Sequence, residues 1–318
     1  MPRALPSPHL SGLFAQWAVQ PVAIVVAVAL LAWYLAAARS PQARTGERGW
    51  PLGRTAIFVA GIALFGWTTC GWPEVYRRSL YWAWTAQALT LLLVVPVLLL
   101  AGKPLELARM RHGAHGPVQR LLDSRTARVL ANPLVGPALV PVLSGLLFFG
   151  PVPDWALRSQ AVAWILQLAL VALGAGITLP LLGPDVAAGS LAVGLSLAIG
   201  SLELVLDAIP GVALRLRTGR ASDYFIHRTA HSWAPSALHD QQIAGSILWC
   251  VAELIDLPFL LLVFRRWLAA DARDAAQIDA VLEAERVARS APGADEPWWL
   301  TDPQLRGRAR PDDPSRPR

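Results

Sequence analysis

Three of the six histidines in this chain fall close together, between two strongly apolar segments. His227 and His231 are four residues apart, so on a helix both imidazole rings would project to one side, a spacing that can ligate a metal. His239 follows Pro235, which interrupts the segment, so a turn would have to bring its ring to the other two. Imidazole is a common ligand of copper and zinc. Two interpretations stay open: a copper or other metal site at the outer face, or interfacial histidines that hold no metal.

Four carboxylates lie within two predicted membrane spans, where ionisable side chains are costly and rare. Glu203 and Asp207 are four residues apart on one span, and Glu253 and Asp256 are three apart on the next. Each pair therefore shares one helix face. One interpretation is a path for protons or a small solute through the membrane, which is the function of a transporter or channel. The other is a polar seam that holds the two helices together.

A membrane domain has to position these residues. Of the 318 residues, 54% are hydrophobic and only 16% are charged, whereas about a quarter are charged in a soluble domain. Helices are predicted, because the apolar runs have the roughly 20 residues that cross a bilayer rather than the ten-residue alternation of barrel strands. The expected fold is an all-α polytopic membrane helix bundle of about seven spans, at 18–38, 55–73, 82–102, 132–150, 160–182, 186–210 and 241–264.

Basic residues predict the orientation of these spans. With the N-terminus outside, the loops at 39–54 and 103–131 lie inside and hold ten Lys and Arg, the C-terminal tail adds ten more, and eight lie outside. Cytoplasmic loops carry an excess of Lys and Arg, so we expect an N-out, C-in protein of the bacterial inner membrane. Because the net charge of +6 arises beside membrane spans, the lipid bilayer is the expected partner and nucleic acid is not.

Four regions are expected along the chain. Residues 1–16 form an outer N-terminal segment, and residues 17–268 form the seven-span membrane domain. The charged, alanine-rich stretch at 269–290 predicts a cytoplasmic helix whose mixed charges face solvent. Residues 291–318 are rich in Pro, Gly, Asp and Arg, a composition that cannot form a core and predicts a disordered tail.

Enzyme signatures do not occur in this sequence. It has no P-loop, no dinucleotide-binding glycine motif and no nucleophile elbow. Arg228 follows His227 where the zinc-protease signature requires a glutamate as its base. The two cysteines, Cys70 and Cys250, form no Cys-x-x-Cys motif. We therefore expect a protein that is not an enzyme.

The segment at 240–249 is the most specific motif, and it reads Asp-Gln-Gln-Ile-Ala-Gly-Ser-Ile-Leu-Trp. It is similar to the pattern Asp-Gln-x-x-x-Gly-x-x-Met-Trp of the cytochrome c oxidase assembly factors of the CtaG type, except that Leu248 replaces Met. The first residue directly precedes the seventh predicted span, where a carboxylate would cap that helix. The motif residues are Asp240, Gln241, Gln242, Gly245 and Trp249.

Two further stretches carry the same resemblance, which extends over about residues 15–270. Residues 84–88 read Trp-Thr-Ala-Gln-Ala where family members often have His-Met-x-Gln-His, and Gly-Lys-Pro follows at 102–104. Gln167 stands where a histidine is common in the family, ahead of an apolar run that ends in Leu-Pro-Leu-Leu-Gly at 179–183. The family consists of multi-span bacterial proteins implicated in copper supply to the oxidase.

The resemblance implies a membrane assembly factor for cytochrome c oxidase, with copper handled at the outer face and oxidase subunits as partners. The chain departs from the pattern, because Trp84, Ala88, Gln167 and Leu248 stand where the family offers nitrogen or sulfur ligands. Trp, Ala and Leu supply no copper ligand, and the Gln amide oxygen is poorly suited to Cu(I). Two possibilities stay open: copper handling by the outer histidines, or a scaffold that holds no metal.

Overall fold

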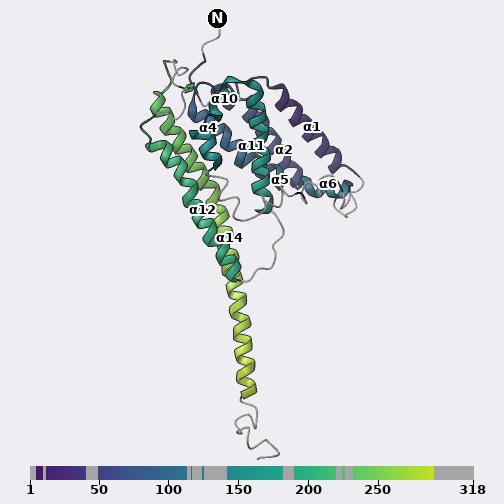
Figure 1. Ribbon diagram of the computed structural model, residues 1–318. Coiled ribbons are helices and arrows are strands. Elements are labelled where there is room, and N and C mark those ends of the chain that lie inside the picture. Colours follow the sequence, from purple (N-terminus) through teal and green to yellow (C-terminus); the bar gives the residue numbers. More distant parts are fainter. Residues whose placement is uncertain are drawn as a thin grey trace, which may run out of the picture. The chain divides into compact units, whose positions relative to one another are not determined.

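Every regular element among the described residues is helical (Figure 1). The computed structural model describes residues 5–9, 12–40, 49–112, 116, 124, 142–181, 190–219, 224–225 and 232–289. The N-terminal elements are α1 (Pro21–Ala38), α2 (Leu52–Cys70), α3 (Trp72–Tyr76), α4 (Tyr81–Leu89), the π-helix η3 (Thr90–Val94), α5 (Val95–Ala101) and α6 (Pro104–His112). The later elements are the π-helix η4 (Gly145–Phe149), α10 (Val152–Arg158), α11 (Gln160–Leu181), α12 (Ser190–Leu216) and α14 (Ala237–Arg289).

Four helical segments within the described residues are long and apolar enough to cross a bilayer: Pro21–Ala38, Leu52–Tyr76, Tyr81–Ala101 and Gln160–Leu179. They correspond to the first, second, third and fifth predicted spans, so the all-helical class is confirmed and four of the predicted spans are candidate membrane helices. The seven-span count and the N-out orientation stay predictions. Much of the predicted span at 132–150 lies outside the described residues, as does the start of the one at 186–210.

The chain forms two compact units, Met1–Val186 with Ala198–Leu261, and Ala187–Leu197 with Leu262–Arg318. In the first unit α2 packs against α1 and α5, and α11 packs against α5 and η3. In the second unit, Gly194 allows close approach of Trp267, since an added Cβ would lie 3.1 Å from its Nε1. One helix, α14, contains the predicted seventh span and continues through the charged stretch to Arg289.

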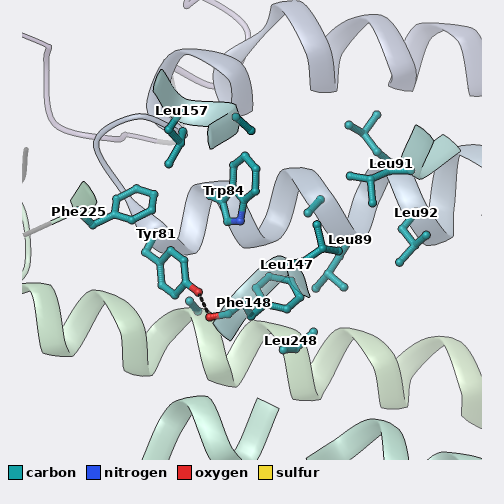
Figure 2. Packing of buried hydrophobic residues seen from close by; sticks show 14 of the residues in the cluster. Tyr81, Trp84, Leu89, Leu91, Leu92, Leu147, Phe148, Leu157, Phe225 and Leu248 are labelled. Carbon is teal, nitrogen blue, oxygen red and sulfur yellow. Dashed lines mark hydrogen bonds between the residues drawn. The ribbon is translucent and has the colours of Figure 1, made fainter. Parts of the chain in front are cut away.

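The core of the first unit gathers side chains from helices that are distant in sequence. Figure 2 shows Tyr81, Trp84 and Phe148 within this cluster, together with Leu248 of α14. The buried Tyr81 hydroxyl donates a hydrogen bond to the carbonyl oxygen of Phe148 at 2.7 Å, drawn as the dashed line in Figure 2. A buried tyrosine requires such a partner for its polar end.

The π-helix η3 follows from the sequence. Pro96 has no backbone N–H to donate to the carbonyl of Leu92, and its ring crowds that carbonyl, so a regular α-helix is disfavoured here. The Val95 N–H instead bonds to the carbonyl of Thr90, five residues back. Gly174 of α11 lies against this point, since an added Cβ would be only 1.8 Å from Leu92 O and 2.7 Å from Pro96 Cγ. The closest approach of α11 to the η3–α5 region therefore requires glycine.

Candidate functional site

A buried ion pair lies at the turn after α2. α2 ends at Cys70, and the next residue must be glycine, since a Cβ added to Gly71 would lie 2.5 Å from Trp67 O. The short helix α3 then begins with a proline in its first turn. The i,i+3 spacing places Glu74 and Arg77 on one side of this turn, with Arg77 Nε 2.7 Å from Glu74 Oε2. The Arg77 side chain is fully buried and the Glu74 side chain is 2% exposed. Such residues are almost never fully buried unless they are paired.

Three glutamine amides converge on the Glu74 carboxylate, and each donates a hydrogen bond of 2.8 Å. Gln20 Nε2 donates to Oε1, while Gln87 Nε2 and Gln167 Nε2 donate to Oε2. Gln20 directly precedes α1, Gln87 lies on α4 and Gln167 lies on α11. One carboxylate therefore joins α3 to three other parts of the bundle. We refer to Gln20, Glu74, Arg77, Gln87 and Gln167 as the Glu74 cluster.

Further hydrogen bonds fix the orientation of these amides. The Gln20 Oε1 atom accepts hydrogen bonds from Gln160 Nε2 and Trp164 Nε1, both at 2.8 Å. Gln87 Nε2 also donates to the Thr68 carbonyl oxygen at 2.9 Å. Because the amide oxygen of Gln20 is occupied by two donors, its nitrogen must point at Glu74. The cluster is thus held by partners on α2 and α11 as well as by its own members.

A small cavity of about 10 Å³ adjoins the Glu74 cluster. It is lined by Arg77, Trp84, Gln87, Ala88, Leu91, Ala163, Leu166, Gln167 and Leu170. Three of the positions that depart from the family pattern, Trp84, Ala88 and Gln167, thus border one space. Leu248, which also departs from it, is buried in the hydrophobic core (Figure 2). The sequence did not predict that these residues meet, because α4 and α11 are separated by some seventy residues.

The residues around this cavity do not fit copper. Cu(I) prefers thiolate, thioether or imidazole ligands, and none of the lining side chains carries such a group. The Gln167 amide is also already engaged with Glu74 through its nitrogen. Within the part of the chain that the structure describes, no group of three or more His, Cys, Asp or Glu side chains could hold a metal ion.

Asp240 caps a different helix from the one predicted. Its Oδ2 atom accepts the Tyr81 backbone N–H at 2.7 Å and its Oδ1 atom accepts that of Trp82 at 3.0 Å. The prediction that it caps its own helix is wrong, since α14 already begins at Ala237 and Ser236 Oγ accepts the His239 N–H there. The start of α4 has no side-chain cap of its own. Asp240, fully buried, supplies one from across the bundle.

Burial is the largest influence on this carboxyl and raises the pKa of Asp240, while the two backbone N–H groups that it accepts act in the opposite direction. The carboxyl therefore depends on these two N–H groups to compensate for its loss of water.

The next motif residues join α14 to α12. Gln241 Nε2 lies 3.2–3.3 Å from the carbonyl oxygens of Leu214, Arg217 and Gly219, at the end of α12, where carbonyls lack helical partners. Gly245 lets the two helices touch, because an added Cβ would be 2.6 Å from Arg215 N and 2.7 Å from Gly211 O. The motif thus holds α4, α12 and α14 together through hydrogen bonds and close helix packing.

The remaining motif residues bond within α14. The Gln242 carbonyl oxygen accepts the Ser246 hydroxyl at 2.8 Å, and Trp249 Nε1 donates to Glu253 Oε1 at 2.9 Å. Glu253 is therefore engaged with the exposed Trp249 ring on its own helix. Asp207 of α12 is buried.

The predicted histidine and carboxylate sites stay predictions. His227 and His231 lie outside the described residues, and His239 is exposed at the start of α14. The side chains of Glu203 and Asp256 also lie outside the described set. The Glu74 cluster was not predicted, because its two charges fall at the end of an apolar run and resemble loop residues. The i,i+3 spacing of opposite charges after Pro73 is a signal from which the ion pair, though not its glutamine partners, could have been predicted.

Replacing Asp240 with alanine is expected to lower the free energy of unfolding by about 0.5–2 kcal/mol, because α4 loses its cap. Asp240→Asn keeps one acceptor oxygen, so it should lower the free energy of unfolding much less than Asp240→Ala does. Thermal unfolding of the detergent-purified protein, followed by circular dichroism, measures both. The exposed Asp271 on the same helix provides the control, and Asp271→Ala should leave the stability of the protein unchanged. Equal stability of Asp240→Ala and wild type would contradict the cap.

These observations define an all-helical membrane protein whose core is joined by a buried ion pair, glutamine amides and a cross-helix cap. The family model described as the cytochrome c oxidase caa3 assembly factor (Caa3_CtaG) matches residues 32–270. The chain belongs to this family, which confirms the resemblance carried by the three motifs.

Two curated mycobacterial proteins are similar to the chain. Uncharacterized protein ML1998 of Mycobacterium leprae (strain TN) is 24% identical over 283 residues, which cover 86% of this chain and 42% of that protein. Uncharacterized protein Mb0105 of Mycobacterium bovis (strain ATCC BAA-935 / AF2122/97) is 24% identical over 249 residues, 74% of this chain and 37% of that protein. The chain therefore spans less than half the length of these curated relatives. No solved structure matches the chain.

Proposed function

We propose that this protein is an assembly factor for cytochrome c oxidase in the bacterial inner membrane, with a non-enzymatic role. In this proposal it acts by binding oxidase subunits and not by holding copper inside its own helix bundle. Membership of the caa3 assembly factor family supports the assembly role. The cavity beside the Glu74 cluster supports a role without copper inside the bundle, because none of the side chains that line it is a suitable copper ligand.

The motif geometry supports a scaffold. Asp240 accepts hydrogen bonds from the start of α4, and Gln241 donates hydrogen bonds to the end of α12. Gly245 determines how closely α12 and α14 pack. These residues determine the shape of the bundle and are not free to bind a ligand. The parts of the family pattern that position helices are present in this chain, whereas the ligand positions carry Trp, Ala, Gln and Leu. A fold can keep its shape while its site chemistry changes.

A strain that lacks this protein is expected to show a marked loss of cytochrome c oxidase activity in its membranes. The loss follows because the oxidase subunits would lack their assembly partner. Oxygen uptake with reduced cytochrome c and the haem absorbance spectrum of the membranes measure the effect. Wild-type protein supplied from a plasmid should restore both. Unchanged oxidase spectra and turnover in the deletion strain would reject the proposal.

A variant that lacks the outer histidines distinguishes a role through contact with oxidase subunits from a role through copper supply. If the protein acts by contact, a variant with His227→Ala, His231→Ala and His239→Ala restores the deletion strain as wild type does. Added copper then leaves the deletion strain deficient. If instead the variant fails and copper salts restore oxidase activity, the outer histidines supply copper and the contact proposal is wrong.

A further inference from the structure

The cavity beside the Glu74 cluster is bordered by hydrogen-bond donors that lack protein acceptors. Arg77 has five N–H donors in its guanidinium group, and its Nε lies against Glu74. Neither Nη1 nor Nη2 has an acceptor among the described residues, although the whole side chain is buried. The Trp84 indole N–H is likewise buried without an acceptor in the described part of the chain. Both residues line the cavity.

The nearest carboxylate is already engaged by other donors. Glu74 accepts hydrogen bonds from three glutamine amides, and Arg77 Nε lies 2.7 Å from one of its oxygens. The amides of Gln87 and Gln167 and the Arg77 Nε atom all lie at the same oxygen, Oε2, which leaves no room there for a further donor. Leaving the remaining donors of a buried guanidinium unpaired is costly. Among the described residues, no protein acceptor is present for these donors.

We propose that this cavity is a binding site for a small monatomic anion, with chloride as the physiological ligand. The space of about 10 Å³ holds about one water-sized particle, which excludes phosphate, carboxylates and headgroups. A halide only accepts hydrogen bonds, so it satisfies Arg77 and Trp84 without adding donors. Charge-assisted hydrogen bonds from a guanidinium are the strong kind that such an anion needs.

This inference is independent of the oxidase role and is tested on the full-length protein in detergent. The protein is placed in sodium gluconate, whose anion is too large for the cavity, and titrated with sodium chloride at constant ionic strength. We expect a saturable rise in Tm, and a broadening of the ³⁵Cl NMR signal that bromide competes away.

Two variants and a control test which residues bind the anion. Arg77→Gln is expected to abolish the chloride response. Trp84→Phe keeps the ring but removes its N–H, and should weaken chloride binding about tenfold, the effect of one lost hydrogen bond to a charged group. Arg158→Gln, a change at an exposed arginine of α10, should leave the response unchanged.

Trp84→Phe decides the question if Arg77→Gln does not fold. The proposal is overturned if wild-type Tm and the ³⁵Cl line width are the same as in an unrelated membrane protein of similar charge. It is also overturned if Trp84→Phe binds chloride as tightly as wild type. Either result would assign the cavity to water, and neither would bear on oxidase assembly.

Discussion

Replacing Glu74 with alanine is expected to lower the free energy of unfolding by about 3–5 kcal/mol, the usual cost of removing one member of a buried ion pair. The reason is the partner that stays behind. Arg77 is fully buried, and without the carboxylate its charge would have no compensating group. The same change also removes an acceptor from Gln20, Gln87 and Gln167, of which Gln87 still has the Thr68 carbonyl oxygen. Unpaired buried amides add to the cost.

The chain contains a matched control for this variant. Glu283 and Arg286 form an ion pair with the same i,i+3 spacing, but their side chains are 63% and 78% exposed. An exposed pair contributes about 0–1 kcal/mol, so Glu283→Ala should change Tm little. The free energies come from denaturant unfolding in detergent, followed by circular dichroism. If Glu74→Ala proves as mild as Glu283→Ala, the cluster does not hold the bundle together.

A double variant separates the charge from the packing. Glu74→Leu combined with Arg77→Met removes both charges and keeps most of the apolar volume. Replacing a whole buried pair by apolar groups is often neutral, so the double variant should be more stable than Glu74→Ala. The lost amide acceptors would account for the part that is not recovered.

The sequence allowed the class of fold and the family to be predicted, but not the site. Four predicted spans appear as membrane-length helices because twenty apolar residues in a row have few alternatives to a helix in lipid. The 240–249 motif pointed to the family because it is similar to the family's pattern, with Leu248 in place of Met. Both signals are local in sequence.

The Glu74 cluster depends on contacts that no local pattern encodes. Gln20, Gln87 and Gln167 lie on different elements, and a single glutamine in an apolar stretch does not indicate its partner. Asp240 was assigned to its own helix for the same reason, because its true partners, the N–H groups of Tyr81 and Trp82, are 159 and 158 residues away. Predicting these pairs would require knowing which helix ends meet, and that follows only from the packed bundle.

Replacing Gly174 with alanine is expected to destabilise the protein by about 1–3 kcal/mol, the usual cost of overpacking a core. The added Cβ would lie 1.8 Å from the Leu92 carbonyl oxygen and 2.7 Å from Pro96 Cγ. The first contact is with backbone, so no side-chain rotation relieves it. The bundle can accommodate the methyl group only if α11 moves away from η3. Because Gln167 lies on the same helix, that movement would also stretch its 2.8 Å hydrogen bond to Glu74.

Gly66 of α2 distinguishes this steric effect from the general consequence of losing a glycine. A Cβ added there meets no atom within 4 Å, and alanine is favoured over glycine in a helix interior by about 1 kcal/mol. Gly66→Ala should therefore raise Tm or leave it unchanged, while Gly174→Ala lowers it. Thermal unfolding in the same detergent compares the two. Shifts of the same sign would mean that helix propensity governs both positions, and that α11 does not pack against η3 as closely as the structure places it.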